Sequence, residues 1–96
     1  MQQYVIIAQD GNDEGAMERR KNIRQTHLEG AKKLKENNNF ILGGAILDEE
    51  GKMRGSVMMV QFESEEDFRK WYEKEPYITA GVWKKIEVRP FRVADV

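Results

Sequence analysis

Tyr4-Val5-Ile6-Ile7-Ala8 is a short apolar run near the start of the chain, and a turn-forming cluster, Asp10-Gly11-Asn12-Asp13, follows it closely. A run of this length, rich in β-branched residues, is typical of a β-strand. Apolar side chains occupy both alternating sets of positions, so we expect the strand to be covered on both faces. Phe40–Leu47 and Ser56–Phe62 are apolar on both faces in the same way. This two-sided pattern predicts a sheet buried on both sides, and it decides the fold.

A long helix is predicted between the first two strands, from Asp13 or Glu14 to about Asn37. Acidic residues lie near its expected start and lysines near its expected end, which suits the helix dipole. Seven residues recur at spacings of three or four positions and therefore lie on one face of the helix: Met17, Arg20, Arg24, His27, Leu28, Ala31 and Leu34. Asn37-Asn38-Asn39 ends the helix, because asparagine tolerates the left-handed conformation used there.

Turn signals separate the remaining elements. Residues 48–52 predict a hairpin turn, and Gly43-Gly44 suggests a bulge in the strand before it. Ser64 is a good N-cap for a second helix, which Pro76 is expected to end. After a turn over residues 77–81, Trp83–Val93 predicts a fourth strand. Pro90 restricts the end of that strand to an edge or a bulge.

The order β-α-β-β-α-β is that of the ferredoxin-like fold, an α+β class with a four-stranded antiparallel sheet. Two helices can cover only one face of such a sheet. The other apolar face therefore needs a partner, and a second copy of the chain can supply it. We expect one domain over residues 1–96 and a homodimer packed sheet to sheet, a dimeric α+β barrel.

Composition narrows the class of protein. The 96 residues carry 16 basic and 17 acidic side chains, a net charge of -1, which argues against nucleic-acid binding. No apolar run is long enough to span a bilayer, and Met1-Gln2-Gln3 has no basic residue of a signal peptide. With no cysteine there is no disulfide framework. We expect a cytoplasmic protein that contacts neither nucleic acid nor membrane.

His27 is the single histidine, and helical spacing places it on the inward face. It is therefore the default residue for proton transfer near neutral pH. One histidine without cysteine cannot form a typical zinc site within one chain, and Gly43-Gly44 lacks the pattern of a phosphate loop. No metal and no cofactor are expected.

Other polar residues each have a functional and a structural interpretation. Arg20 and Arg24, on the stripe of His27, are interpreted as an anion clamp. The alternative is that Arg19, Arg20 and Lys21 form a solvated patch near the acidic Asp10, Glu14 and Glu18. Ser56 either binds a ligand or caps the hairpin, and Asp48 is either a rival carboxylate or an ordinary turn residue. Tyr77 is a pocket candidate. The aromatic residues Trp71 and Tyr72 are expected in the core. Four methionines are expected either in the core or at the dimer interface: Met17, Met53, Met58 and Met59.

Several short segments together resemble the YciI-like (YCII-related) family over nearly the whole chain: residues 5–10, Arg19-Arg20, Arg24 with His27-Leu28, Leu42-Gly43-Gly44, Gly55-Ser56, Glu75-Pro76-Tyr77, residues 80–82 and 88–91. The resemblance implies a dimeric ferredoxin-like fold and an active site centred on a histidine and an aspartate. The histidine corresponds to His27. The aspartate belongs to an Asp-Pro-Tyr or Asp-Pro-Phe motif, and Glu75 stands at its position. Residues 43–45 read Gly-Gly-Ala where the family usually has Ala-Gly-Pro.

Two functions follow as hypotheses. In the first, His27 and Glu75 are the catalytic pair of a small dimeric enzyme, and Arg24, Tyr77, Ser56 and Arg20 bind the substrate. The reaction is of the isomerase, lyase or dehydrohalogenase type, on a small, anionic and aromatic metabolite. In the second, the protein is a non-catalytic ligand-binding or interaction module, which the replacement of aspartate by Glu75 favours. Both hypotheses require His27, Glu75 and Tyr77 to converge on one pocket.

Overall fold

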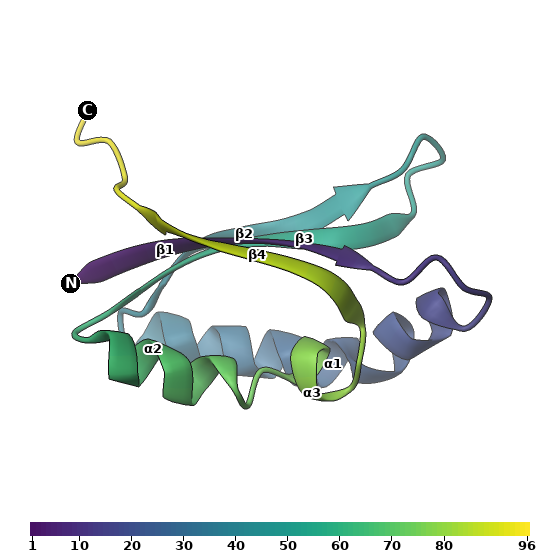
Figure 1. Ribbon diagram of the computed structural model, residues 1–96, viewed down its shortest axis with the longest axis horizontal. Helices are drawn as coiled ribbons and strands as arrows, with labels where there is room; N and C mark the ends of the chain where they lie inside the picture. The colour runs from purple at the N-terminus through teal and green to yellow at the C-terminus, as the bar shows by residue number, and fades with distance from the viewer.

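Four strands form one antiparallel sheet, and all the helices lie against the same face of it (Figure 1). The computed structural model describes the whole chain, residues 1–96. In chain order the elements are β1 (Gln2–Asp10), α1 (Ala16–Glu36), β2 (Phe40–Leu47), β3 (Met53–Phe62), α2 (Glu65–Tyr72), α3 (Pro76–Thr79) and β4 (Trp83–Phe91). This is the expected α+β ferredoxin-like fold. No helix has both the length and the apolar character needed to cross a membrane.

The strand order is β2-β3-β1-β4, so β1 is paired on both sides. Tyr4 of β1 lies opposite Val60 of β3 on one side and Pro90 of β4 on the other. β4 is an edge strand, which confirms the position expected from Pro90, because proline has no N–H to donate to a further strand.

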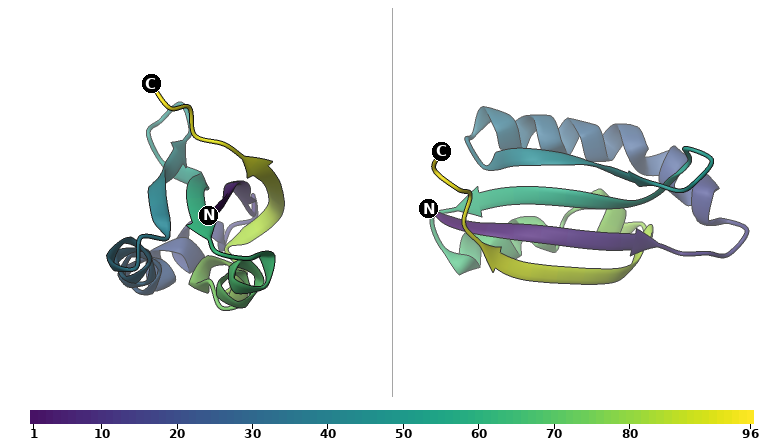
Figure 2. Two further views of the ribbon diagram at one scale, coloured as in Figure 1. Left: turned by 90° about the vertical axis from the view of Figure 1, so that its left-hand side faces the viewer. Right: turned by 90° about the horizontal axis from the view of Figure 1, so that it is seen from above.

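The hydrophobic core lies between the sheet and the helices. β1 contributes one alternating set of side chains to it, including the fully buried Ile6, while Val5 and Ile7 point to the other face. In β3 the same alternation buries Met58 and turns Met59 outward. Figure 2 shows that face of the sheet with no helix over it. The two-sided apolar pattern is confirmed, and this chain by itself covers only one side.

The second helical region differs from the expectation. α2 ends at Tyr72, and Pro76 begins the separate short helix α3, so the prediction that Pro76 ends the second helix was wrong. The physical reason is that a proline at the first position of a helix loses no hydrogen bond, since that N–H has no partner inside the helix. Glu75, as the residue before proline, is extended with φ −61° and ψ 123°, and its side chain caps α3. Other boundaries shift slightly: β1 extends over Gln2–Asp10, α1 begins at Ala16, β3 begins at Met53, and β4 ends at Phe91.

β2 has a bulge, but at Ile41 rather than at the expected Gly43-Gly44. The pairing passes from Phe40 opposite Val60 to Leu42 opposite Met59, which leaves one extra residue in β2. The bulge lets Phe40 and Gly43 face the helices together although three positions separate them. A Cβ at Gly43 would lie 2.9 Å from the Phe40 ring. A side chain at position 43 would therefore displace the Phe40 ring from its place over the strand.

We predict that Gly55→Ala destabilises the fold. A Cβ at Gly55 would lie 2.4 Å from the backbone oxygen of Ala8 in the neighbouring strand, and backbone cannot yield as a flexible side chain does. The expected loss in the free energy of unfolding is about 1–3 kcal/mol, measured by urea denaturation. Gly30→Ala is the control: it adds a methyl to open space within α1 and should stabilise by about 0.5–1 kcal/mol. Equal urea midpoints for Gly55→Ala and Gly30→Ala would contradict the prediction, because they would show that the two strands can move apart at Gly55 at little cost in stability.

Candidate active site

His27 and Glu75 meet in the interior, although 48 positions separate them in the sequence. His27 projects from α1 and is 8% exposed, and Glu75, just before α3, is 3% exposed. The Nδ1–H of His27 donates to Oε1 of Glu75. The other carboxylate oxygen, Oε2, accepts the backbone N–H of Tyr77 at 2.5 Å. The longer glutamate side chain thus makes both contacts at once.

This pairing selects one tautomer of the imidazole. Because Nδ1 carries the proton that faces the carboxylate, Nε2 of the neutral ring keeps a free lone pair. The ring itself is held by aromatic neighbours: it stacks on Tyr77 with centroids 3.8 Å apart and meets the edge of Trp83 at 6.1 Å. His27 therefore has a fixed orientation and one nitrogen available for chemistry.

Arg20 is buried and organises the polar part of the site. Its Nε donates to Oδ2 of Asp10 at 2.7 Å. Its Nη2 donates to the backbone oxygen of Gly55 at 2.7 Å and to Oγ of Ser56 at 2.6 Å. Its Nη1 donates to the Tyr77 hydroxyl at 3.3 Å, and the guanidinium lies over the Tyr77 ring. The solvated-patch interpretation is therefore wrong for Arg20, whose charge is neutralised by Asp10.

Two hydroxyl groups of the site keep a proton to donate. The Ser56 Oγ accepts hydrogen bonds from both Arg20 and the Trp83 indole N–H, the latter at 3.2 Å, so its own O–H is free. The Tyr77 oxygen accepts from Arg20 in the same way. Burial raises the pKa of the Tyr77 phenol, which keeps it protonated at neutral pH. Both groups can therefore act as neutral hydrogen-bond donors.

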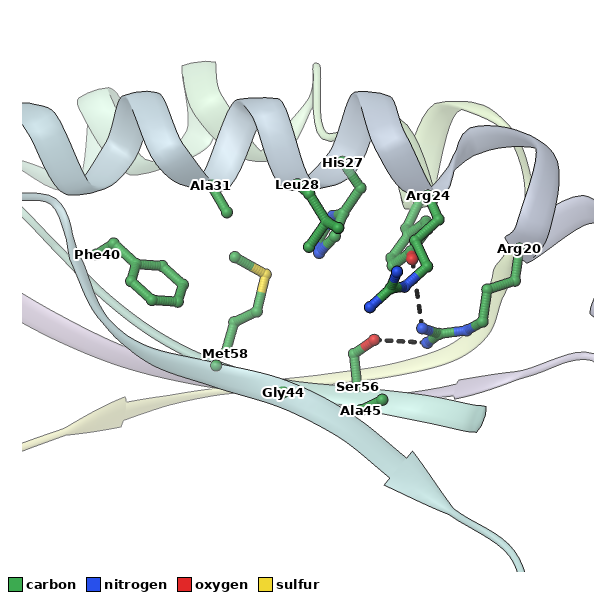
Figure 3. Close-up of a pocket in the computed structure, with 12 residues that line it drawn as sticks. Arg20, Arg24, His27, Leu28, Ala31, Phe40, Gly44, Ala45, Ser56 and Met58 are labelled. Atoms are coloured by element: carbon green, nitrogen blue, oxygen red, sulfur yellow. Dashed lines mark hydrogen bonds between the residues drawn. The ribbon is translucent and has the colours of Figure 1, made fainter. Parts of the chain in front are cut away.

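Arg24 differs from Arg20, one turn away on the same helix. Its side chain is exposed and descends from α1 toward Ser56 and Arg20 (Figure 3). It makes no ion pair with any carboxylate of the chain, whereas the surface arginine Arg19 pairs with Asp13. Arg24 is the cation of the site that is available to an anionic ligand.

These residues surround a cavity of about 110 Å³, referred to below as the His27 cavity. It is well below the roughly 300–1,000 Å³ of pockets for drug-sized ligands, so it suits a small metabolite. Five of the six predicted site residues line it: Arg20, Arg24, His27, Ser56 and Tyr77. The sixth, Glu75, lies behind His27 and holds it. Figure 3 shows the two arginines at one end and the apolar Ala31 and Phe40 at the other.

Asp10 is a residue of the site that is not predicted from the sequence. It lies at the end of β1, and its side chain, 3% exposed, neutralises Arg20. A signal is present, because Asp10 lies two positions after the buried Ala8 in the same strand, but the glycine and asparagine after Asp10 indicate an exposed turn. The sequence pattern indicates only that Trp83 begins the fourth strand, and it gives no sign of the hydrogen bond from Trp83 to Ser56.

Asp48, the rival carboxylate, is a turn residue outside the His27 cavity. It accepts the backbone N–H groups of Glu50 at 2.8 Å and Lys52 at 3.0 Å, and Arg54 donates to it at 3.0 Å. The hydrogen bond from Lys52, followed by the one from Arg54, lowers the pKa of Asp48.

Of the aromatic residues, Trp71 and Tyr72 are partly buried and pack against the core as expected. Nowhere are three His, Cys, Asp or Glu side chains grouped so that they could hold a metal ion.

The family assignment follows from comparison with known proteins. The YCII-related domain matches residues 2–92. This chain belongs to the YCII-related family. Among the relatives of this YCII-related protein, an uncharacterised protein of Haemophilus influenzae is 36% identical over 95 residues, and the protein YciI of Escherichia coli is 30% identical. Each alignment covers 93% of this chain and 95% of the relative.

Solved structures agree with the fold of the YCII-related chain. The 5-chloro-2-hydroxyhydroquinone dehydrochlorinase of Burkholderia phenoliruptrix, in complex with 2,5-dihydroxybenzoquinone, matches with a TM-score of 0.80 at 22% identity, covering 96% of this chain and 95% of that one. A dimeric ferredoxin-like protein of unknown function from a Jannaschia species matches with a TM-score of 0.56 at 14% identity, covering 97% and 100%. At these identities the likeness establishes the fold.

We predict that Asp10→Ala destabilises the protein strongly, because it leaves the Arg20 charge buried without its partner. Removing one member of a buried ion pair costs about 3–5 kcal/mol, a large share of the stability of a small domain. Thermal unfolding measures the change. Asp13→Ala, in the exposed pair with Arg19, is the matched control and should leave the midpoint nearly unchanged. Similar midpoints for the two variants would mean that water reaches Arg20.

Proposed function

We propose that this protein is an enzyme that moves a proton on a small anionic metabolite, in an isomerase or lyase type of reaction. One observation carries the proposal: the only histidine is buried, hydrogen-bonded through Nδ1 to a buried carboxylate, and lines a cavity of metabolite size. A carboxylate that orients an imidazole in this way is the usual arrangement for a general base.

In the reaction we propose, Nε2 of His27 takes a proton from a carbon or hydroxyl group of the substrate. The imidazolium that forms is stabilised by the Glu75 carboxylate. The negative charge left on a substrate oxygen is met by Arg24 and by the free hydroxyl proton of Ser56. His27 then returns the proton at another atom, which gives an isomerisation, or a leaving group departs with its electron pair, which gives an elimination.

The shape of the His27 cavity supports a ligand with two unlike ends. Arg24 and Ser56 favour an oxygen-bearing, anionic end, while Ala31, Phe40 and Met58 favour an apolar edge. A hydroxylated ring has this character. The dehydrochlorinase of the same fold acts on a chlorinated hydroxyhydroquinone and binds a dihydroxybenzoquinone, which supports a phenolic or quinone-like ligand here as well.

We also propose that two copies of the chain pack through their open sheet faces. The outer face presents Ile7 and Leu42, which are 39% and 62% exposed, together with Val57 and Met59. A contiguous apolar surface of this kind is unusual on a monomer. The dimeric ferredoxin-like protein from Jannaschia supports the same assembly for this chain.

We expect turnover of 5-chloro-2-hydroxyhydroquinone, or of a related hydroxyhydroquinone, that depends on His27. His27→Ala should lower kcat by about 10²–10⁴-fold, the usual contribution of a general base. Binding of 2,5-dihydroxybenzoquinone, followed by fluorescence quenching of the tryptophans, should weaken much less. Binding without any turnover in the wild-type protein would instead favour the non-catalytic module.

The role of Glu75 is measured on the imidazole itself. At alkaline pH, where a free imidazole is neutral, ¹⁵N NMR should show His27 with its proton on Nδ1. Glu75→Ala should move the population toward the tautomer protonated on Nε2, because the acceptor for Nδ1–H is gone. Glu73→Ala, an exposed neighbour, is the control and should change nothing. The same tautomer in all three proteins would remove Glu75 from the catalytic pair.

Sedimentation velocity at micromolar concentration tests the dimer. We expect a single species of twice the 11.2 kDa chain mass. Met59→Lys, on the outer face, should shift it to the monomer, because a lysine cannot be buried there without a partner. Glu29→Lys, at an exposed position of α1, changes the charge by +2, against +1 for Met59→Lys, and should still leave the dimer intact. A wild-type monomer would refute the assembly.

A further inference from the structure

A second hollow adjoins the His27 cavity. It lies between the first half of α1 and the start of β3, with a volume of about 420 Å³. Its walls are Met17, Arg20, Lys21, Arg24 and Gln25 from α1, with Lys52 and Met53 from the β2–β3 hairpin. Arg20 and Arg24 also line the His27 cavity, so the two spaces meet at these side chains. We refer to this second hollow as the cationic groove.

The groove concentrates positive charge in a chain whose net charge is -1. Four of its seven residues are cationic and none is acidic. Asp10 neutralises Arg20, but Lys21, Arg24 and Lys52 form no ion pair. Among the other surface arginines, Arg19, Arg54, Arg69 and Arg89 each pair with a carboxylate, whereas Arg92 near the C-terminus forms no ion pair. Three uncompensated cations therefore converge on one concave surface.

The spacing along α1 relates the groove to the chemistry. Arg24 precedes His27 by three residues and Lys21 by six, which is about 5 and 9 Å along the helix axis. An anion held in the groove would therefore lie one to two helical turns from the imidazole. Met17 and Met53 add flexible apolar side chains to the wall of the groove.

We propose that the natural ligand is at least a dianion. Its reacting part occupies the His27 cavity and faces Arg24, which lines both spaces. A second acidic group, carboxylate or phosphate, is bound in the groove by Lys21 and Lys52. The assignment of the reacting part rests on the proposed function. The groove itself depends only on charge and shape, so it can be tested without turnover.

The experiment compares glutarate with butyrate, a monoanion of similar length. Affinities are measured by NMR titration of the ¹⁵N-labelled protein, with the Arg24 Nε–H signal as the local probe. We expect glutarate to bind about ten-fold tighter than butyrate, which corresponds to one additional charge-assisted contact. The Lys21→Ala/Lys52→Ala double variant should lose this difference while its affinity for butyrate stays the same. 4-Phosphonobutyrate, run in parallel, distinguishes a groove that prefers phosphate from one that prefers carboxylate.

Lys32→Ala/Lys33→Ala is the matched control, because it removes two exposed lysines from the same helix, outside the groove. It should leave the ratio of the two affinities unchanged. Equal affinities of the wild type for glutarate and butyrate would overturn the proposal. An equal loss of the preference for glutarate in both double variants would also overturn it, because the preference would then depend on overall charge and not on the groove. His27→Ala should keep the preference for glutarate. A failed catalytic pair is thus distinguishable from a failed groove.

Discussion

The buried guanidinium of Arg20 is the constraint on which the site depends. A charge removed from water must be paired and hydrogen-bonded, or the fold loses several kcal/mol. Here the partners come from three different elements: Asp10 ends β1, Ser56 lies in β3, and Tyr77 belongs to α3. Satisfying one side chain therefore fixes a helix, two central strands and the segment that carries Glu75 relative to one another.

Glu75 links this framework to the chemistry. One oxygen of its carboxylate starts α3 by accepting the Tyr77 N–H, and the other accepts the Nδ1–H of His27. Pro76 holds Glu75 in the extended conformation in which both contacts are possible. The start of α3 and the orientation of the imidazole thus depend on one carboxylate. The extra methylene compared with the aspartate of the family motif does not break the pair, because Glu75 reaches both partners.

Periodicity predicted what depends on local patterning: the strands, the long helix and the inward orientation of His27. Contacts between distant segments were harder to predict. Asp10 precedes Gly-Asn-Asp, a composition that indicates a turn whether or not the carboxylate is buried, so only the tertiary structure reveals its pairing with Arg20. Pro76 is compatible both with the end of one helix and the start of another. The bulge at Ile41 has no side-chain signature, yet it brings Phe40 over Gly43 and shapes the apolar end of the cavity.

Arg20 and Arg24 show why residue type alone could not assign the roles of the cations. They lie one turn apart on one helix face, but Asp10 is opposite the first and no carboxylate is opposite the second. A compensated guanidinium already has its charge and most of its hydrogen bonds satisfied, so it builds the site. An uncompensated one stays hydrated until an anion displaces its water, and the attraction then grows as the local dielectric falls. The position of the carboxylates relative to each arginine, and not the number of arginines, therefore distinguishes an arginine that stabilises the fold from one that is free to bind a ligand.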